Sequence, residues 1–275
     1  MNFVYVLSPD FYPHLFVSLR SLFSSKTTVS NVFVFSVGGG IQNRFGSLPI
    51  NIIEVPTKSE DYWMLNKTYV SEVNCDEVCF IDSDVIVKKD ISKTSNSGSD
   101  ITARRSTAYT LDTYEEKLWE EFLRKKGAKK KVPILNAGFL WLRNGIHRKI
   151  GEEWELVMRD AWERGFFGNG YHADQWSLPV VLGRREATYS LLGPEDHALA
   201  WEGDPLEEAT LYHTGASNFF STVRSMENPD FLDADLPIPR PNVTWNYLKD
   251  RIGKKWKTLS SATPKAENQD VWLED

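Results

Sequence analysis

Asp82 and Asp84 are two carboxylates separated by a single residue, and they follow directly after the apolar run of residues 78–81. Apolar sequence resumes at residues 85–87, so a polar turn interrupts a segment that is otherwise typical of a buried strand. Two carboxylates placed in this way can converge on one hard cation, because Mg²⁺ and Mn²⁺ take carboxylate oxygens and keep positions open for phosphate. We therefore expect a divalent cation here rather than an ordinary polar turn.

The elements around this turn alternate between short strands and helices. The pattern predicts strands at residues 3–7, 32–37, 50–55 and 77–81, with helices at about residues 11–24 and 61–73. This order is typical of a mostly parallel sheet with helices on both faces, whose ligands lie at the carboxyl ends of the strands. Residues 8–10 and 82–84 follow two of these strands and should lie at the same edge.

The second half of the chain is less regular. It predicts helices at about residues 112–126, 147–165 and 173–182, and strands at residues 134–142 and 210–213. Residues 226–241 are rich in proline and acidic residues, as in an extended linker. We expect one domain at residues 1–225, followed at residues 226–275 by this linker, a basic amphipathic helix and a polar tail.

Four segments, taken in order, resemble glycosyltransferases of the GT-A fold, particularly family 8, which includes glycogenin and bacterial galactosyltransferases. The segments are Val-Leu-Ser-Pro-Asp-Phe-Tyr at residues 6–12, Phe-Ile-Asp-Ser-Asp at 80–84, Leu-Asn-Ala-Gly-Phe-Leu-Trp-Leu at 135–142, and Ala-Asp-Gln-Trp at 173–176. The resemblance covers about residues 1–220. It implies an α/β, Rossmann-like GT-A domain with a mostly parallel sheet flanked by helices, followed by a C-terminal helical extension.

The resemblance also implies a metal-dependent transferase whose donor is a nucleotide diphosphosugar, with a UDP-sugar as the expected one. Asp82 and Asp84 would bind Mn²⁺, or Mg²⁺, against the diphosphate. A late histidine completes the metal site in the family, and His213 occupies the corresponding stretch, with His197 as the competing candidate. The chain departs from the family after this histidine: it reads His-Thr-Gly-Ala-Ser-Asn-Phe-Phe, and the family's Lys-Pro-Trp is absent.

Other side chains would then bind the donor. Lys67 and Arg104 lie where the family places basic or sugar-contacting residues, and the Tyr12 or Phe11 ring could stack on the base. The full expected set is Ser8, Asp10, Tyr12, Lys67, Asp82, Ser83, Arg104, Asn136 and Gly138. Each position also has a plain structural explanation, such as surface charge for the two basic residues or strand packing for Gly138.

Asp174 and Gln175 are the expected catalytic residues. If the family's stereochemistry holds, the leaving diphosphate deprotonates the acceptor on the same face and Gln175 stabilises an oxocarbenium-like state, so that the anomeric configuration is retained. An inverting enzyme would need a general base, for which Asp174 could serve. His172 adjoins this pair and could contact substrate. The alternative is that Asp174 and Gln175 merely cap a helix.

Composition limits the class of protein. The chain has 275 residues, a net charge of −6 and 25% charged residues, which excludes a mainly disordered, collagen-like or coiled-coil protein. No window approaches the ~20 apolar residues of a membrane span, and we find no signal peptide. Cys75 and Cys79 are expected to be free thiols. These features together predict a cytoplasmic protein.

The acceptor and two alternative functions stay open. The lysine cluster of residues 125–131 and the basic C-terminal helix fit a solvated face, a peripheral contact with a membrane, or a grip on a polyanion such as DNA. The acceptor could thus be a glycan, a lipid, a protein or a nucleic acid. A non-catalytic nucleotide-sugar-binding module is one alternative. A sugar-phosphate nucleotidyltransferase is the other, but it would need a glycine-rich loop at residues 8–20, whereas Gly38–Gly40 follows the second predicted strand.

Overall fold

The computed structural model of the protein describes residues 1–41, 45–94, 98–106, 113–164, 172–205, 207–226 and 230–240. Seven strands form a central sheet in the order β3-β2-β1-β4-β7-β6-β8. They are β1 (Asn2–Leu7), β2 (Asn31–Val37), β3 (Ile50–Val55), β4 (Val78–Ile81), β6 (Ile101–Arg105), β7 (Leu135–Leu142) and β8 (Tyr189–Leu192). Only β7 pairs antiparallel with its neighbours, so the sheet is mostly parallel, as predicted.

A second sheet of three short strands lies beside the first. Its order is β5 (Val85–Val87), β10 (Leu211–His213) and β9 (His197–Leu199). β10 runs antiparallel to β5 and parallel to β9. Because β5 directly follows the turn after β4, this small sheet connects the polar turn of residues 82–84 to the last third of the chain.

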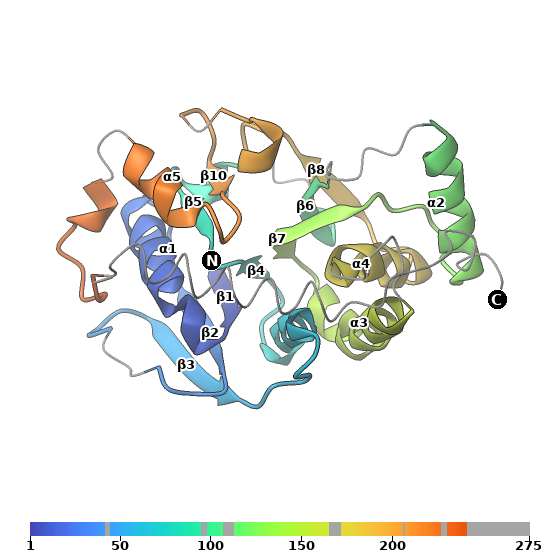
Figure 1. Ribbon diagram of the computed structural model, residues 1–275, viewed down its shortest axis with the longest axis horizontal. Coiled ribbons are helices and arrows are strands. Elements are labelled where there is room, and N and C mark those ends of the chain that lie inside the picture. Colours follow the sequence, from blue (N-terminus) through green and yellow to red (C-terminus); the bar gives the residue numbers. More distant parts are fainter. Residues whose placement is uncertain are drawn as a thin grey trace.

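Helices cover both faces of the central sheet (Figure 1). The α-helices are α1 (Tyr12–Ser24), α2 (Thr113–Lys125), α3 (Ile146–Glu163), α4 (Ala173–Arg184) and α5 (Phe219–Ser225). The 3₁₀ helices are η1 (Pro9–Phe11), η2 (Trp63–Glu72), η3 (Ile91–Lys93), η5 (Ala200–Glu202) and η6 (Asp230–Leu232). Among the described residues, no helix is both long and apolar enough to cross a membrane.

Side chains of the central strands point alternately to the two faces of the sheet, and each face has its own hydrophobic core. Val4, Val6 and Phe80 pack on one side with residues of η2, α3 and α4. Tyr5 and Ile81 face the other side, where α1 and strands β5 and β10 contribute the partners. Side chains of a strand point alternately to the two faces, and a strand buried on both faces reads as a continuous apolar run. This explains why residues 78–81 could be recognised as a strand.

Several elements differ from the prediction. Residues 63–72 form a 3₁₀ helix, and β6, β8 and β9 were not predicted. Strands β8 and β9 are short and carry no clear alternation, and β6 includes two arginines. The predicted basic helix and polar tail beyond residue 241 lie outside the described residues.

Arg20 binds the described part of the proline-rich segment to the domain. This side chain is buried on α1, and its guanidinium donates hydrogen bonds to the carbonyl oxygens of Phe231, Ala234 and Ile238. Ile238 itself is buried in the core that contains α1. Residues 230–240 therefore pack against the first helix, and the expected boundary at residue 225 remains a prediction.

Candidate active site

Strand pairing places Asp82 next to the Asn-Ala-Gly segment. The end of β4 pairs antiparallel with β7, with Ile81 opposite Phe139, and the Asp82 N–H donates to the Gly138 carbonyl at 2.8 Å. The start of β7 and the end of β4 therefore meet at the same edge of the sheet. Asn136 lies at this edge as well, because it precedes Gly138 by two residues. Its Oδ1 accepts the Gly138 N–H at 3.0 Å.

The small sheet brings His213 to Asp84. Val85 pairs with His213 in the antiparallel β5–β10 ladder, and the Thr214 N–H donates to the Asp84 carbonyl at 3.2 Å. The imidazole Nε2 lies 3.3 Å from Asp84 Oδ1, and Nδ1 lies 3.2 Å from Asn136 Oδ1. Two residues about 130 positions apart in the chain thus share one site because β5 and β10 pair.

Asp82, Asp84 and His213 form a group that fits a divalent cation. Each offers one ligand atom, and these atoms lie within 4.8 Å of one another. Two carboxylate oxygens and one imidazole nitrogen are a donor set that Mn²⁺ accepts. Burial raises the pKa of the Asp82 carboxyl against the opposing charge of Lys67, and repulsion from Asp84 adds to the rise. A cation between the two carboxylates would relieve that repulsion.

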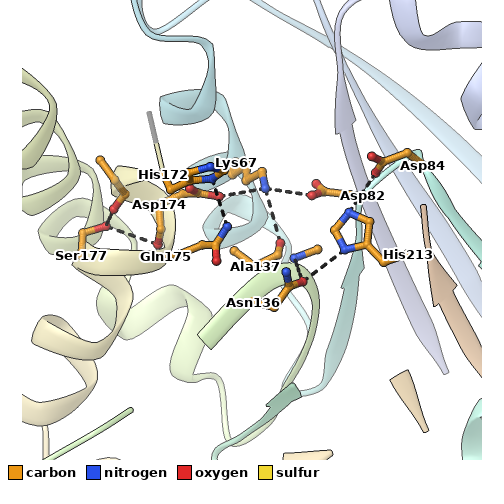
Figure 2. Close-up of polar contacts among 12 residues, drawn as sticks. Lys67, Asp82, Asp84, Asn136, Ala137, His172, Asp174, Gln175, Ser177 and His213 are labelled. Atoms are coloured by element: carbon orange, nitrogen blue, oxygen red, sulfur yellow. Dashed lines mark hydrogen bonds and ion pairs between the residues drawn. The ribbon is translucent and has the colours of Figure 1, made fainter. Parts of the chain in front are cut away.

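Lys67 connects this group of three residues to Asp174, one of the two predicted catalytic residues. Its Nζ lies 2.9 Å from Asp82 Oδ2 and 2.9 Å from Asp174 Oδ2, in a straight line of contacts across the site (Figure 2). Burial alone would lower the pKa of the Lys67 ammonium, but Asp174 and Asp82 outweigh it and raise the pKa above its usual range. Lys67 is therefore a charged residue inside the site, and not a solvated surface lysine.

Asp174 and Gln175 lie in the first turn of helix α4 and are not its N-cap. The N-cap residue is His172, and the Asp174 N–H donates to the Tyr62 hydroxyl at 3.2 Å, so the pair does not act as the N-cap of this helix. The Asp174 side chain instead faces Lys67, and the Gln175 amide Nε2 lies 3.3 Å from His172 Nδ1. Asp174 Oδ1 and Gln175 Oε1 are buried and have no hydrogen-bond partner among the described residues. Two buried acceptor oxygens therefore remain for a ligand.

Gly138 is needed for the His213 position. A Cβ added at Gly138 would lie 2.1 Å from His213 Cε1 and 2.3 Å from Nδ1. The imidazole has little room to move, because the His197 ring stacks on one side at 5.8 Å between centroids and the Trp201 ring meets it edge-on at 4.9 Å. Only glycine allows the backbone of β7 to approach the histidine this closely.

Gly138→Ala should therefore mimic loss of the histidine. We expect Mn²⁺ affinity to fall by at least about tenfold, measured by electron paramagnetic resonance of free Mn²⁺. The control is the double variant with His213→Ala. Because both changes act through one side chain, the double variant should bind Mn²⁺ no more weakly than His213→Ala alone. Additive losses would show that Gly138 acts elsewhere.

The residues after β1 lie along the same edge of the sheet. Ser8 follows β1 and is buried, with no partner for its hydroxyl among the described residues, and Asp10 lies in η1. The Tyr12 hydroxyl contacts Ser36 Oγ at 2.6 Å and the Gly39 carbonyl at 2.6 Å, which joins the start of α1 to the glycine turn after β2. Since β1 is the parallel neighbour of both β2 and β4, these residues lie at the same edge of the sheet as Asp82.

Arg104 has partners that the sequence did not reveal. Its Nη2 lies 3.2 Å from Glu202 Oε2 and 3.3 Å from Asp204 Oδ2, so the guanidinium is bound by two carboxylates. Trp201, which adjoins Glu202, contacts the His213 ring and was also missed. The available signal was a tryptophan within the polar stretch Trp-Glu-Gly-Asp at residues 201–204, a context that is unusual for a core residue.

Two phenylalanines lie in the stretch after His213, where the sequence departs from the family's Lys-Pro-Trp. Phe219 and Phe220 of α5 are buried, and their rings lie 4.9 and 4.6 Å from the His14 ring. Burial lowers the pKa of His14 to about 4. The start of helix α5 therefore contributes aromatic packing around His14 at this place.

The lysine cluster is largely paired with acidic groups or backbone. Lys126 lies 3.3 Å from Asp160, Lys129 lies 3.6 Å from Glu186, and Lys131 is paired with Glu120. Lys130 donates to the Ala187 carbonyl at 3.0 Å. Exposed pairs of this kind contribute little to stability, but they reduce the positive charge that this surface offers to a polyanion.

The comparisons with known proteins give a fold and no sequence family. No protein-family model matches the chain, and no curated protein matches it. Among solved structures, the glycosyltransferase GlyE of Streptococcus pneumoniae TIGR4 matches 98% of this chain at 15% identity and a TM-score of 0.54. The chain spans only 66% of GlyE.

Two further solved structures that match the chain are also glycosyltransferases. The galactosyltransferase LgtC, in complex with donor and acceptor sugar analogues, matches 98% of this chain over 99% of its own at 15% identity, with a TM-score of 0.52. The bifunctional glycosyltransferase WbbM matches 93% of this chain and 51% of its own at 12% identity, with a TM-score of 0.54. The chain therefore has the GT-A fold of these glycosyltransferases, and its Asp-x-Asp turn lies at the carboxyl end of a central strand.

Proposed function

We propose that the protein is a metal-dependent glycosyltransferase that transfers a sugar from a nucleotide diphosphosugar, with UDP as the nucleotide. The observation that carries the proposal is the group of Asp82, Asp84 and His213 at the carboxyl edge of a GT-A sheet. Mn²⁺, or Mg²⁺, bound there would neutralise charge on the leaving diphosphate as a Lewis acid. Ser8, Asp10, Tyr12 and Ser83 border this group and would contact the nucleotide.

Metal is essential in this proposal because the described residues offer little other positive charge. Lys67 is shared between two carboxylates, and Arg104 is bound by two more. Burial keeps His14 neutral at pH 7 by lowering its pKa to about 4. Donor affinity should therefore depend strongly on the metal ion, more so than in a site with a free lysine at the diphosphate.

The sugar of the donor would lie between the metal group and helix α4. Asn136 is held by Gly138 and His213, and the unpartnered Asp174 Oδ1 and Gln175 Oε1 can each accept a hydrogen bond from a sugar hydroxyl. Buried acceptors without a donor are costly, so a hydroxyl that bonds to them gains affinity. This feature favours a sugar over an apolar ligand.

Retention of configuration is the stereochemistry that we propose. An inverting mechanism needs a free base, but Lys67 already neutralises Asp174 and occupies one of its oxygens. Gln175 carries no charge and can place its Oε1 near a developing positive charge on the sugar ring. A glutamine is an active-site residue of LgtC, where one structure carries a glutamine-to-glutamate substitution. The anomeric coupling constant of the product, measured by proton NMR, distinguishes the two outcomes.

The first test is calorimetric titration of UDP, UDP-sugars and GDP-sugars, each with and without Mn²⁺. Binding of a UDP-sugar only when Mn²⁺ is present, followed by slow release of free sugar, would support the transferase. The absence of phosphate-binding lysine at residue 219 also favours a second candidate, a non-catalytic nucleotide-sugar-binding module. That candidate requires binding without any donor turnover. No binding of any nucleotide would contradict both.

Gln175→Ala should separate binding from chemistry. We expect UDP-sugar affinity to fall by no more than about tenfold, the cost of one lost hydrogen bond, while turnover falls by at least about 100-fold, since a contact that strengthens in the transition state affects rate more than binding. Gln175→Glu is the matched variant of the same size. Parent-rate turnover in Gln175→Ala would remove the residue from the reaction.

A further inference from the structure

Trp201 is an exposed tryptophan beside the metal group. It lies in η5 directly after β9 and is 46% exposed, whereas Trp119, Trp141, Trp154 and Trp176 are all buried. Those four contribute to the cores on the two faces of the sheet. A large aromatic side chain left in solvent at the edge of a site has no such packing role, and tryptophan is enriched in binding surfaces.

The Trp201 ring is fixed close to the reacting groups. It meets the His213 ring at 4.9 Å between centroids and an interplanar angle of 76°. Gly215, which has a φ of 70°, places its backbone against the same ring, since a Cβ added there would lie 3.8 Å from it. The exposed part of the indole is therefore one ring away from a metal ligand. A group resting on it would lie next to the sugar donor.

Hydrogen-bonding residues follow Trp201 in the chain. Glu202 follows Trp201 directly, and Arg104 holds both Glu202 and Asp204, which also accepts the Leu199 N–H at 3.0 Å. Glu202 Oε1 and Arg104 Nε are buried and have no partner among the described residues. One acceptor and one donor thus remain without a partner on Glu202, which follows Trp201, and on Arg104, which pairs with Glu202. An apolar platform with a few fixed polar groups is the usual construction of a small-ligand site.

The charge of the groups near Trp201 indicates which class of acceptor could bind there. One arginine faces two carboxylates, and Asp82 and Asp84 lie on the other side of His213. The trio of Arg104, Glu202 and Asp204 therefore carries one net negative charge. Lys67 offsets one of the two aspartates of the metal group, so that group adds one more negative charge before a metal ion binds. A phosphate placed here would be repelled, because like charges a few ångströms apart interact unfavourably by about 1 kcal/mol even in water. A neutral ligand with hydroxyl groups suits both the charge and the unpartnered atoms.

We propose that Trp201 is the platform for the acceptor, and that the acceptor is the terminal pyranose of a neutral saccharide. The C–H face of the ring would stack on the indole while its hydroxyls bond to Glu202 and Arg104. This inference rests on the proposed transferase function and names its acceptor class. It selects a glycan from the acceptor classes that the sequence left open, and it disfavours a nucleic acid.

The experiment uses the full chain saturated with Mn²⁺ and UDP, so that donor binding is measured first and separately. Lactose, maltose and cellobiose are then added as neutral probes, with a 20-mer DNA duplex as the polyanion probe. Saturation-transfer NMR and calorimetry report binding. We expect at least one disaccharide to bind, with saturation greatest at the C–H groups of one face, and the DNA not to bind.

The variants then identify the platform. Trp201→Ala should weaken disaccharide binding by at least about tenfold, which corresponds to about 1.4 kcal/mol, and Trp201→Phe should restore most of it. Leu156→Ala is the control, because Leu156 is another large apolar side chain left in solvent, 68% exposed on α3. UDP affinity in Mn²⁺ should change by less than about twofold in Leu156→Ala and in Trp201→Phe, whose ring can still contact His213. Trp201→Ala removes that contact, so its disaccharide binding is measured at saturating Mn²⁺ and UDP.

Each other outcome overturns the inference. Unchanged disaccharide binding in Trp201→Ala removes the platform. Binding of the DNA duplex in place of the disaccharides assigns the surface to a polyanion. If UDP binds with Mn²⁺ but no disaccharide does, the inference fails and the transferase proposal stands. If UDP fails to bind the parent protein, the transferase proposal itself fails, and the first titration already shows it.

Discussion

Asp84→Asn should abolish Mn²⁺-dependent donor binding while the protein stays folded. We expect the affinity for UDP in Mn²⁺ to fall at least about 100-fold, because loss of groups that merely orient metal ligands costs about 10–100-fold and Asp84 would be a ligand. The His213 imidazole, together with its hydrogen bond, lowers the pKa of the Asp84 carboxyl against the effect of burial, so the wild-type residue is charged at neutral pH. The amide that replaces it carries no charge. Calorimetry with UDP and Mn²⁺ measures the loss.

Asp76→Asn is the matched control for this change. Asp76 precedes the other end of β4, and its side chain is 87% exposed and pairs with Arg148. Its neutralisation should leave donor affinity within about twofold of the parent, since an exposed ion pair contributes little. Equal affinity of Asp84→Asn and the parent in Mn²⁺ would remove the metal assignment from this turn.

Lys67→Met should destabilise the fold strongly. Lys67 and Asp174 have side chains that are 5% and 2% exposed, and Asp82 shares the same ammonium. Removal of one partner leaves buried carboxylates without compensation, for which we expect a loss of about 3–5 kcal/mol in the free energy of unfolding. Urea unfolding measures it, in the presence of a chelator so that no metal ion substitutes for the lysine.

Two further variants show whether the loss of stability is specific to Lys67. Lys58→Met removes another paired lysine, but the Lys58 and Glu155 side chains are 19% and 26% exposed, so the loss should be no more than about 1 kcal/mol. Lys67→Met combined with Asp174→Asn should recover part of the stability, because it removes the most deeply buried uncompensated charge. If Lys58→Met and Lys67→Met lowered the free energy of unfolding by similar amounts, Lys67 would have no special role in compensating the buried carboxylates.

The carboxylate turn could be predicted because its signal is local. An apolar run, two aspartates and a second apolar run identify a strand end, and the position of β4 inside the sheet makes that end a ligand-binding edge. Strands β1 to β4 were predicted for the same reason, with bounds that lie within one residue of those expected. His213 was assigned by resemblance, and the structure places it within the same group.

What the sequence could not predict depends on contacts between distant segments. Arg104 lies on β6 and its carboxylate partners lie about 100 residues later, so the pairing follows from the placement of β9 and η5 beside β10. The close approach of Gly138 to His213 has the same origin, because a sequence does not show which backbone meets which ring. Lys67 was recognised as a candidate, but its position between two carboxylates became visible only in three dimensions.

Arg20 has a consequence for how the protein can be shortened. A chain that stopped at residue 225 would lose the carbonyl oxygens of Phe231, Ala234 and Ile238 and leave a buried guanidinium without acceptors. A truncation after residue 240 retains all three. The shortest stable form of this domain should therefore include residues 230–240 of the proline-rich segment, and deletion studies of the basic C-terminal region are best started from that point.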